Sequence, residues 1–274
     1  MASEKIPPPA DILSSLFHSK ADARITRLSK ILSTSGGVDS TLTLVGYSLF
    51  FVSSQLSNLQ NLELKILSRL FASNASDSAL KHGSASILRL ADLESSMKLL
   101  AGMCSDFRTF TRLWGLLGIY AMVKRNYIDP PKDVILNAVS WTQTFALGSY
   151  YVYENGYYLA GKGVLKGWTA GDIKKWAKTS LKMFLAYVVL EYVRLYRARQ
   201  LLEVKRAKAV SAKDNEEIEK EETVWWRTAV MDIAYTPLGM HWASENGMLS
   251  DGWVGALMSM VGLIKFRAAW ALTA

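Results

Sequence analysis

The sequence is poor in the residues that build disulfides and metal sites. Cys104 is the only cysteine among 274 residues, so neither an intramolecular disulfide nor a cysteine cluster for a metal can form. The three histidines, His18, His82 and His241, lie far apart and form no pair with metal-ligand spacing. No pair of acidic residues stands out within an apolar segment. We therefore expect no catalytic centre, no cofactor and no metal.

Strand-like alternation of apolar and polar residues is also almost absent. Apolar residues recur instead at three- and four-residue steps, which predicts an all-α protein. Half of the residues are hydrophobic, nine are Trp and twelve are Tyr, and the formal net charge is +8. Amphipathic aromatic rings favour the water–lipid boundary, and positive charge favours anionic lipid. No nucleic-acid-binding module is recognisable, so we expect no nucleic acid as a partner. The composition predicts a membrane-associated helical bundle with amphipathic helices and one or two hydrophobic helices.

Changes in composition divide the chain into five regions. They are an N-terminal helical region (1–86), an amphipathic membrane-active helix (87–125), central hydrophobic and basic helices (126–208), a charged linker (209–223) and C-terminal hydrophobic helices (224–274). We expect the first helix to begin at Asp11, a loop over 72–86, and a helix end at Pro237. A basic helix is expected over 172–208.

The region 87–125 carries the candidate membrane-binding residues. Its large apolar side chains recur at helical spacing, with basic residues mainly off that stripe. The apolar set that we expect to enter the acyl boundary is Leu93, Met97, Leu100, Phe107, Phe110 and Trp114. The basic set that we expect to hold lipid phosphates is Arg89, Lys98, Arg108 and Arg112. Insertion of such a helix into one leaflet curves the bilayer, because it adds area to that leaflet alone. The pattern also fits a bundle helix whose apolar face packs on other helices.

Two further segments lack charge. Residues 134–153 contain no charged side chain and have the length of a membrane span, although a buried helix of a soluble protein fits equally. Residues 252–264 are uncharged but short, and small residues such as Gly252, Gly255 and Ser259 favour close helix contact. A membrane pore for metabolites built from these two helices is an alternative function.

Residues 35–40 read SGGVDS, a motif by which one family of adenylating enzymes holds pyrophosphate. A nucleotide-binding enzyme is therefore a second alternative. Such a loop requires a buried strand before it, whereas residues 24–32 have helical periodicity and many charges. We interpret the two glycines as a helix stop, followed by a cap from Asp39 or Ser40.

Two segments resemble the peroxin-eleven family of peroxisome-elongating proteins, most closely its fungal members. They are residues 108–120, RTFTRLWGLLGIY, and residues 249–255, LSDGWVG. The order of helical, amphipathic, hydrophobic, charged and glycine-rich apolar parts is similar as well. The resemblance implies a peroxisomal membrane protein that binds, bends and elongates the membrane ahead of peroxisome fission and proliferation. It further implies an anionic phospholipid membrane as partner, a homo-oligomer, and cooperation with a dynamin-related fission GTPase. The central hydrophobic stretch departs from a transmembrane helix in its polarity.

Overall fold

The computed structural model describes residues 17, 19–72 and 77–273, and within them the chain is helical without strands. This confirms the predicted all-α class. The helices are α2 (Lys20–Leu32), α3 (Ser35–Ala72), α4 (Asp77–Thr111), the 3-10 helix η1 (Arg112–Trp114), α5 (Gly115–Ile128), α6 (Val134–Gly161), α7 (Ala170–Lys208), α8 (Ala212–Ala243) and α9 (Asp251–Ala271).

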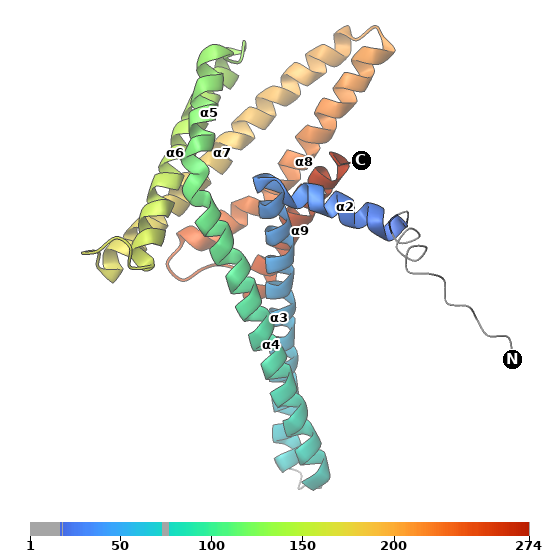
Figure 1. Ribbon diagram of the computed structural model, residues 1–274, viewed down its shortest axis with the longest axis vertical. Helices are drawn as coiled ribbons and strands as arrows, with labels where there is room; N and C mark the ends of the chain where they lie inside the picture. Colours follow the sequence, from blue (N-terminus) through green and yellow to red (C-terminus); the bar gives the residue numbers. More distant parts are fainter. Residues whose placement is uncertain (1–16, 18, 73–76, 274) are drawn as a thin grey trace, which may run out of the picture.

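Long helices pair side by side and project in different directions from a common centre (Figure 1). The far ends of α3 and α4 form one projecting pair, and the ends of α7 and α8 that meet near residue 210 form another. In the centre α9 packs on α3 and α8, while α6 lies between α5 and α7. The α2 helix meets the end of α9, where Arg27 donates to the Trp270 carbonyl at 2.7 Å.

Polar side chains mark where several helices begin. Ser19 and Asp133 accept N–H bonds in the first turns of α2 and α6. Thr169 and Ser211 each form a reciprocal capping box with the Asp three residues later, at the starts of α7 and α8. The expected helix start at Asp11 lies outside the described residues.

Glycines of α9 allow it to lie very close to α3. A Cβ atom at Gly255 would stand 2.7 Å from the Cα of Phe51, and one at Gly262 would stand 2.6 Å from the backbone nitrogen of Leu44. Ser259, between them, lies within 3.4 Å of the Ser48 hydroxyl. The small residues of 252–264 thus form a close helix contact, as their spacing predicts.

The face of α3 that is turned inward is also small and weakly polar. Gly46 packs on Cys104 of α4, and the fully buried side chains of α3 include Ser40, Thr43 and Ser53. Each of these three hydroxyls donates to a carbonyl of its own helix, between 2.6 and 2.9 Å. Their polarity is therefore satisfied without a partner helix, and neighbouring backbones can approach closely.

The molecule exposes far more surface than a compact protein of its size. Its accessible surface is 17944 Å², whereas a compact monomer of this mass exposes about 11,800 Å². The residues outside the description account for at most about 3,500 Å² of this excess, even if they were fully extended. An excess of at least about 2,600 Å² of surface therefore remains open to another medium or partner.

Two segments expected to be irregular are helical. The expected loop over 72–86 is wrong from Asp77 onward, because α4 begins there. The expected linker over 209–223 is wrong from Ala212 onward, because its glutamates line the start of α8 and form ion pairs with the basic end of α7. The composition of 209–223 suggests a solvated chain. Its glutamates instead lie beside the basic end of α7, and this pairing of opposite charges favours a helix from Ala212 onward.

The expected helix end at Pro237 is also wrong. Helix α8 continues through Pro237 to Ala243. Tertiary packing offsets the hydrogen bond that proline removes, since Leu238 is fully buried and Gly239 lies against Leu185 of α7.

We predict that Gly255→Ala destabilises the fold by about 1–3 kcal/mol, because the new methyl group meets the α3 backbone, which cannot give way as a side chain would. Thermal unfolding in detergent, followed by circular dichroism, measures the effect. Gly118→Ala is the matched control, because a Cβ there meets nothing within 4 Å. Equal melting temperatures for the two variants would contradict the close α3–α9 contact.

Candidate functional site

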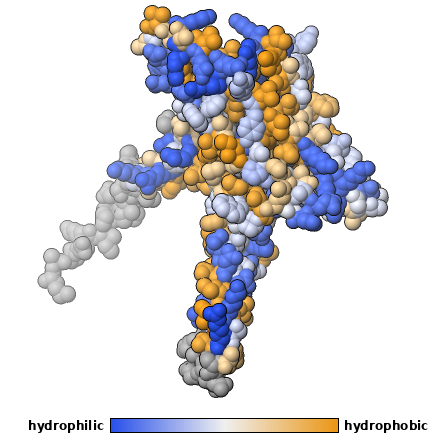
Figure 2. Space-filling view, turned by 180° about the vertical axis from the view of Figure 1, so that it is seen from behind, coloured by the Kyte–Doolittle hydropathy of each residue, from blue (hydrophilic) through white to orange (hydrophobic). Residues whose placement is uncertain are grey.

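Large apolar side chains lie on the outside of α4 and η1. Leu93, Leu100, Phe107, Phe110 and Trp114 are between 46% and 54% exposed. Others on α4 and α5 are more exposed still, namely Leu99, Met103 and Leu117. Figure 2 shows apolar side chains on the outer surface, both on the body and along the projecting pair, where hydrophilic ones are interspersed. We call Leu93, Leu99, Leu100, Met103, Phe107, Phe110, Trp114 and Leu117 the outer apolar face.

The inward side of α4 carries smaller or charged residues. Ile87, Ala101, Cys104 and Arg108 are buried there, and Met97 is half-buried. The usual distribution of a soluble helix, with large apolar groups inside, is therefore reversed over much of α4. An extended apolar surface of this kind marks a contact site for protein or membrane.

The amphipathic helix expected over 87–125 is not continuous. It is interrupted by η1, where the chain changes direction before α5 (Figure 1). Two contacts with α6 fix this interruption. A Cβ at Gly115 would lie 2.4 Å from the Tyr151 ring, and Arg112 is held by Glu154.

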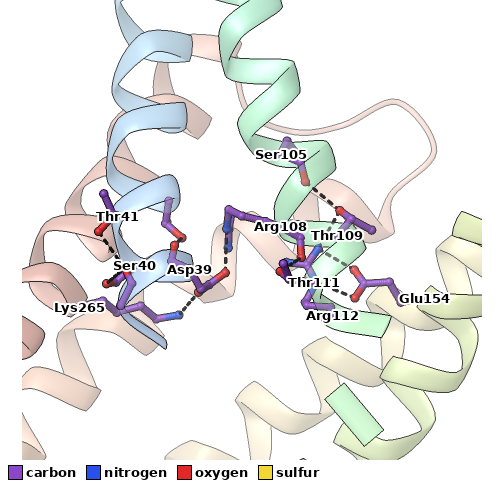
Figure 3. Close-up of polar contacts among 12 residues, drawn as sticks. Asp39, Ser40, Thr41, Ser105, Arg108, Thr109, Thr111, Arg112, Glu154 and Lys265 are labelled. Carbon is purple, nitrogen blue, oxygen red and sulfur yellow. Dashed lines mark hydrogen bonds and ion pairs between the residues drawn. The ribbon is translucent and has the colours of Figure 1, made fainter. Parts of the chain in front are cut away.

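The four basic residues expected to hold lipid phosphates fall into two groups. Arg89 and Lys98 are exposed on α4. Arg108 is buried, and its Nε donates to Asp39 Oδ1 at 2.9 Å. Lys265 of α9 lies 3.8 Å from the other oxygen of Asp39, so one carboxylate joins three helices (Figure 3). Burial opposes the charge of Asp39, but Arg108 and Lys265 outweigh it and hold the pKa of that carboxyl below its usual range.

Arg112 is engaged in a second ion pair. Its Nε and a terminal nitrogen donate to the two oxygens of Glu154, at 2.7 and 2.9 Å (Figure 3). The Tyr150 hydroxyl also donates to Glu154 at 2.7 Å, and burial raises the pKa of that hydroxyl well above its usual value. Such a bidentate, buried pair is geometrically specific.

Asp39 and Glu154 were not among the residues that the sequence singled out for this site. The sequence suggests a cap for Asp39, and Glu154 directly follows the uncharged residues 134–153. Their partners lie 69 and 42 residues away in the chain. An acidic residue next to an apolar segment was the available signal, but spacing alone could not identify its cation.

The SGGVDS segment forms the first turns of α3 and not a phosphate-binding loop. It follows α2, a helix, and a Cβ at Gly37 would stand 2.0 Å from the Ile31 carbonyl oxygen. The cap of α3 is Thr34, whose hydroxyl accepts from the Gly37 N–H at 3.0 Å, so a cap from Asp39 or Ser40 is wrong. The strand that the nucleotide-binding alternative requires is absent from the described residues before this motif.

One helix in the described part of the chain, α9, is long and apolar enough to cross a membrane. The thirteen-residue apolar segment expected over 252–264 is extended at its end to Ala271. The spanning alternative for 134–153 does not meet the same criterion, and α6 carries buried polar groups that bond to other helices. One such group is Gln143, which donates to Glu191 of α7 at 2.5 Å.

A buried acidic cluster lies where α6, α7 and α8 meet. Glu191 accepts from Gln143 and from Arg194. Asp232 of α8 is 5% exposed, and its Oδ2 has no hydrogen-bond partner. Burial first, and then the charge of Glu191, raises the pKa of Asp232 to about 7 against the opposing effect of Arg194. Within the described residues, no three His, Cys, Asp or Glu side chains are arranged to hold a metal ion.

We predict that the contribution of Asp232 to stability falls as pH rises from about 4 to 7, because folded Asp232 keeps a proton that the unfolded chain releases. The contribution of this one group reaches at most about 1.4 kcal/mol per pH unit. Chemical denaturation of Asp232→Asn and the wild type across this range measures it. Parallel stability curves for the two proteins would contradict the raised pKa.

Comparison of the chain with protein-family models, curated protein sequences and solved structures finds no match. No family is therefore assigned by similarity of the whole chain or of its fold. The structural features that bear on function are the outer apolar face, the ion pairs of Arg108 and Arg112, and the apolar α9 helix.

Proposed function

We propose that this chain is a peroxisomal membrane protein that binds, bends and elongates the membrane ahead of peroxisome fission and proliferation. The observation that carries the proposal is the outer apolar face, which exposes Phe107, Phe110 and Trp114 along one side of α4 and η1. Water is a poor medium for this surface, and the acyl boundary of a bilayer is a good one.

The energetics support shallow insertion of this face. Each large side chain that moves from water into an apolar medium contributes roughly 1.5–3 kcal/mol. Its residues are already about half exposed, so they can enter lipid without separation of α4 from α3. A helix embedded in one leaflet enlarges that leaflet alone, and curvature follows.

The basic residues contribute unequally to this proposal. Arg89 and Lys98 are exposed and can reach lipid phosphates directly. Arg108 and Arg112 are already neutralised by Asp39 and Glu154. A lipid phosphate must displace one of these carboxylates before either arginine can bind it. Of the four basic residues expected from the sequence to hold lipid phosphates, two are therefore available in this conformation.

Helix α9 is the anchor in this proposal. Its length and composition suit a membrane span, and only 28% of its most apolar window is buried within the protein. Outward residues such as Trp253 and Leu263 remain exposed. We propose that α9 holds the protein at the bilayer while the outer apolar face acts on one leaflet. Self-association and cooperation with a dynamin-related GTPase belong to the same proposal through the resemblance to the peroxin-eleven family.

We predict that the triple substitution of Leu100, Phe107 and Phe110 by Glu abolishes tubulation of anionic vesicles by the full chain. Loss of three apolar side chains that would each contribute roughly 1.5–3 kcal/mol on entering lipid removes the driving force for shallow insertion. Electron microscopy of vesicles and quantitative flotation measure the effect.

The matched control replaces Val210, Val224 and Trp226 by Glu. These exposed apolar residues lie in or beside α8 and not on α4, and the charge change is identical. This control is expected to tubulate vesicles as the wild type does. Equal activity of the two triple variants, whether both are active or both inactive, would contradict a specific role of the outer apolar face.

A further inference from the structure

A cleft of about 300 Å³ lies on the side of α4 that faces α8 and α9. It is lined by residues of α3, α4, α8 and α9. Aromatic and aliphatic side chains form much of its wall, including Tyr47, Phe50 and Trp242. Part of the wall has little or no side chain, because it is formed by Gly46, Ala101 and Gly102. The cleft therefore has room there for a narrow apolar ligand.

The charged residues of this lining are all basic. Lys98 and Arg108 line the cleft, and no acidic residue does. They lie ten residues apart on α4, which corresponds to about 15 Å along the helix. The cleft is therefore elongated, apolar along its length and positive in charge at two places.

The two cations differ in their availability. Arg108 is paired with Asp39, which balances its charge. Lys98 is exposed, and no ion pair within the described part of the chain involves it. An anionic group bound at the mouth of the cleft would therefore be recognised by Lys98, while the narrow apolar part accepts a chain.

We propose that this cleft holds one acyl chain of an anionic membrane phospholipid, with the lipid phosphate at Lys98. Its volume lies at the lower end of the range of small-molecule sites, about 300–1,000 Å³, which suits a single chain better than a whole lipid. Charge complementarity selects an anionic lipid over a zwitterionic one. The inference rests on the proposed membrane function but concerns a surface distinct from the outer apolar face.

Gly102 provides a way to close the cleft without disturbing the fold. A Cβ at this position meets nothing within 4 Å. Gly102→Leu therefore adds a side chain to the open space of the cleft and removes a helix-weakening glycine. Gly118→Leu is the matched control, since Gly118 is also helical and unobstructed but does not line the cleft.

The experiment uses the full chain in phosphatidylcholine nanodiscs that contain a trace of phosphatidylglycerol with a photoreactive acyl chain. Crosslinked peptides are mapped by mass spectrometry. We expect labelling near Trp242 and Tyr47 in the wild type and in Gly118→Leu, and loss of that labelling in Gly102→Leu. Labelling near Phe107 is expected to persist in all three proteins, because it reports contact of the outer apolar face with lipid.

A second arm tests the charge. Photoreactive phosphatidylcholine is expected to label the cleft less than phosphatidylglycerol does, and Lys98→Gln is expected to equalise the two probes. Equal cleft labelling in wild type and Gly102→Leu, or in wild type by both probes, would overturn the inference. Labelling of the cleft without labelling near Phe107 would support the lipid-binding cleft but contradict the proposed function. The cleft inference and the proposed function can therefore fail separately.

Discussion

The close packing of α3 against two neighbours is the constraint on which the rest of the structure depends. Gly255 and Gly262 of α9 approach the α3 backbone on one side, and Cys104 of α4 packs on Gly46 on the other. Contacts of this kind favour small residues such as Ala101 and Cys104, so most of the large apolar side chains of α4 lie outside the interface. They form the outer apolar face instead, and the molecule retains a surface that water does not favour.

Partly buried ion pairs connect the helices of this arrangement. Asp39 binds Arg108 and Lys265 and so connects α3, α4 and α9, while Glu154 binds Arg112 and connects α6 with η1. Loss of one partner from such a pair leaves the other charge partly buried and unpaired, which destabilises the fold. The pairs therefore fix the face that α4 presents, and they keep two of its arginines away from the surface at which lipid phosphates would arrive.

Helical periodicity was sufficient to predict the all-α class, and the small residues of α9 predicted a close contact. The side of α4 that faces outward could not be predicted, because Leu100 and Cys104 belong to one apolar stripe in sequence, yet Leu100 is 47% exposed while Cys104 is buried. Arg108 and Arg112 were expected at lipid because their acidic partners are remote in sequence. The composition of 209–223 predicts a linker, because it does not reveal that the glutamates at the start of α8 form ion pairs with Lys205 and Arg206 of α7.

The immersion depth of the outer apolar face on a bilayer tests the central claim most directly. Spin labels are placed by Phe107→Cys and, as a reference on the α7–α8 pair, by Lys213→Cys, each in a Cys104→Ala background. Collision with oxygen and with a water-soluble nickel complex then reports depth on anionic vesicles. The account predicts that the label at 107 lies below the lipid phosphates while the label at 213 stays in water. A label at 107 that remains as accessible to the nickel complex on vesicles as in their absence would contradict it.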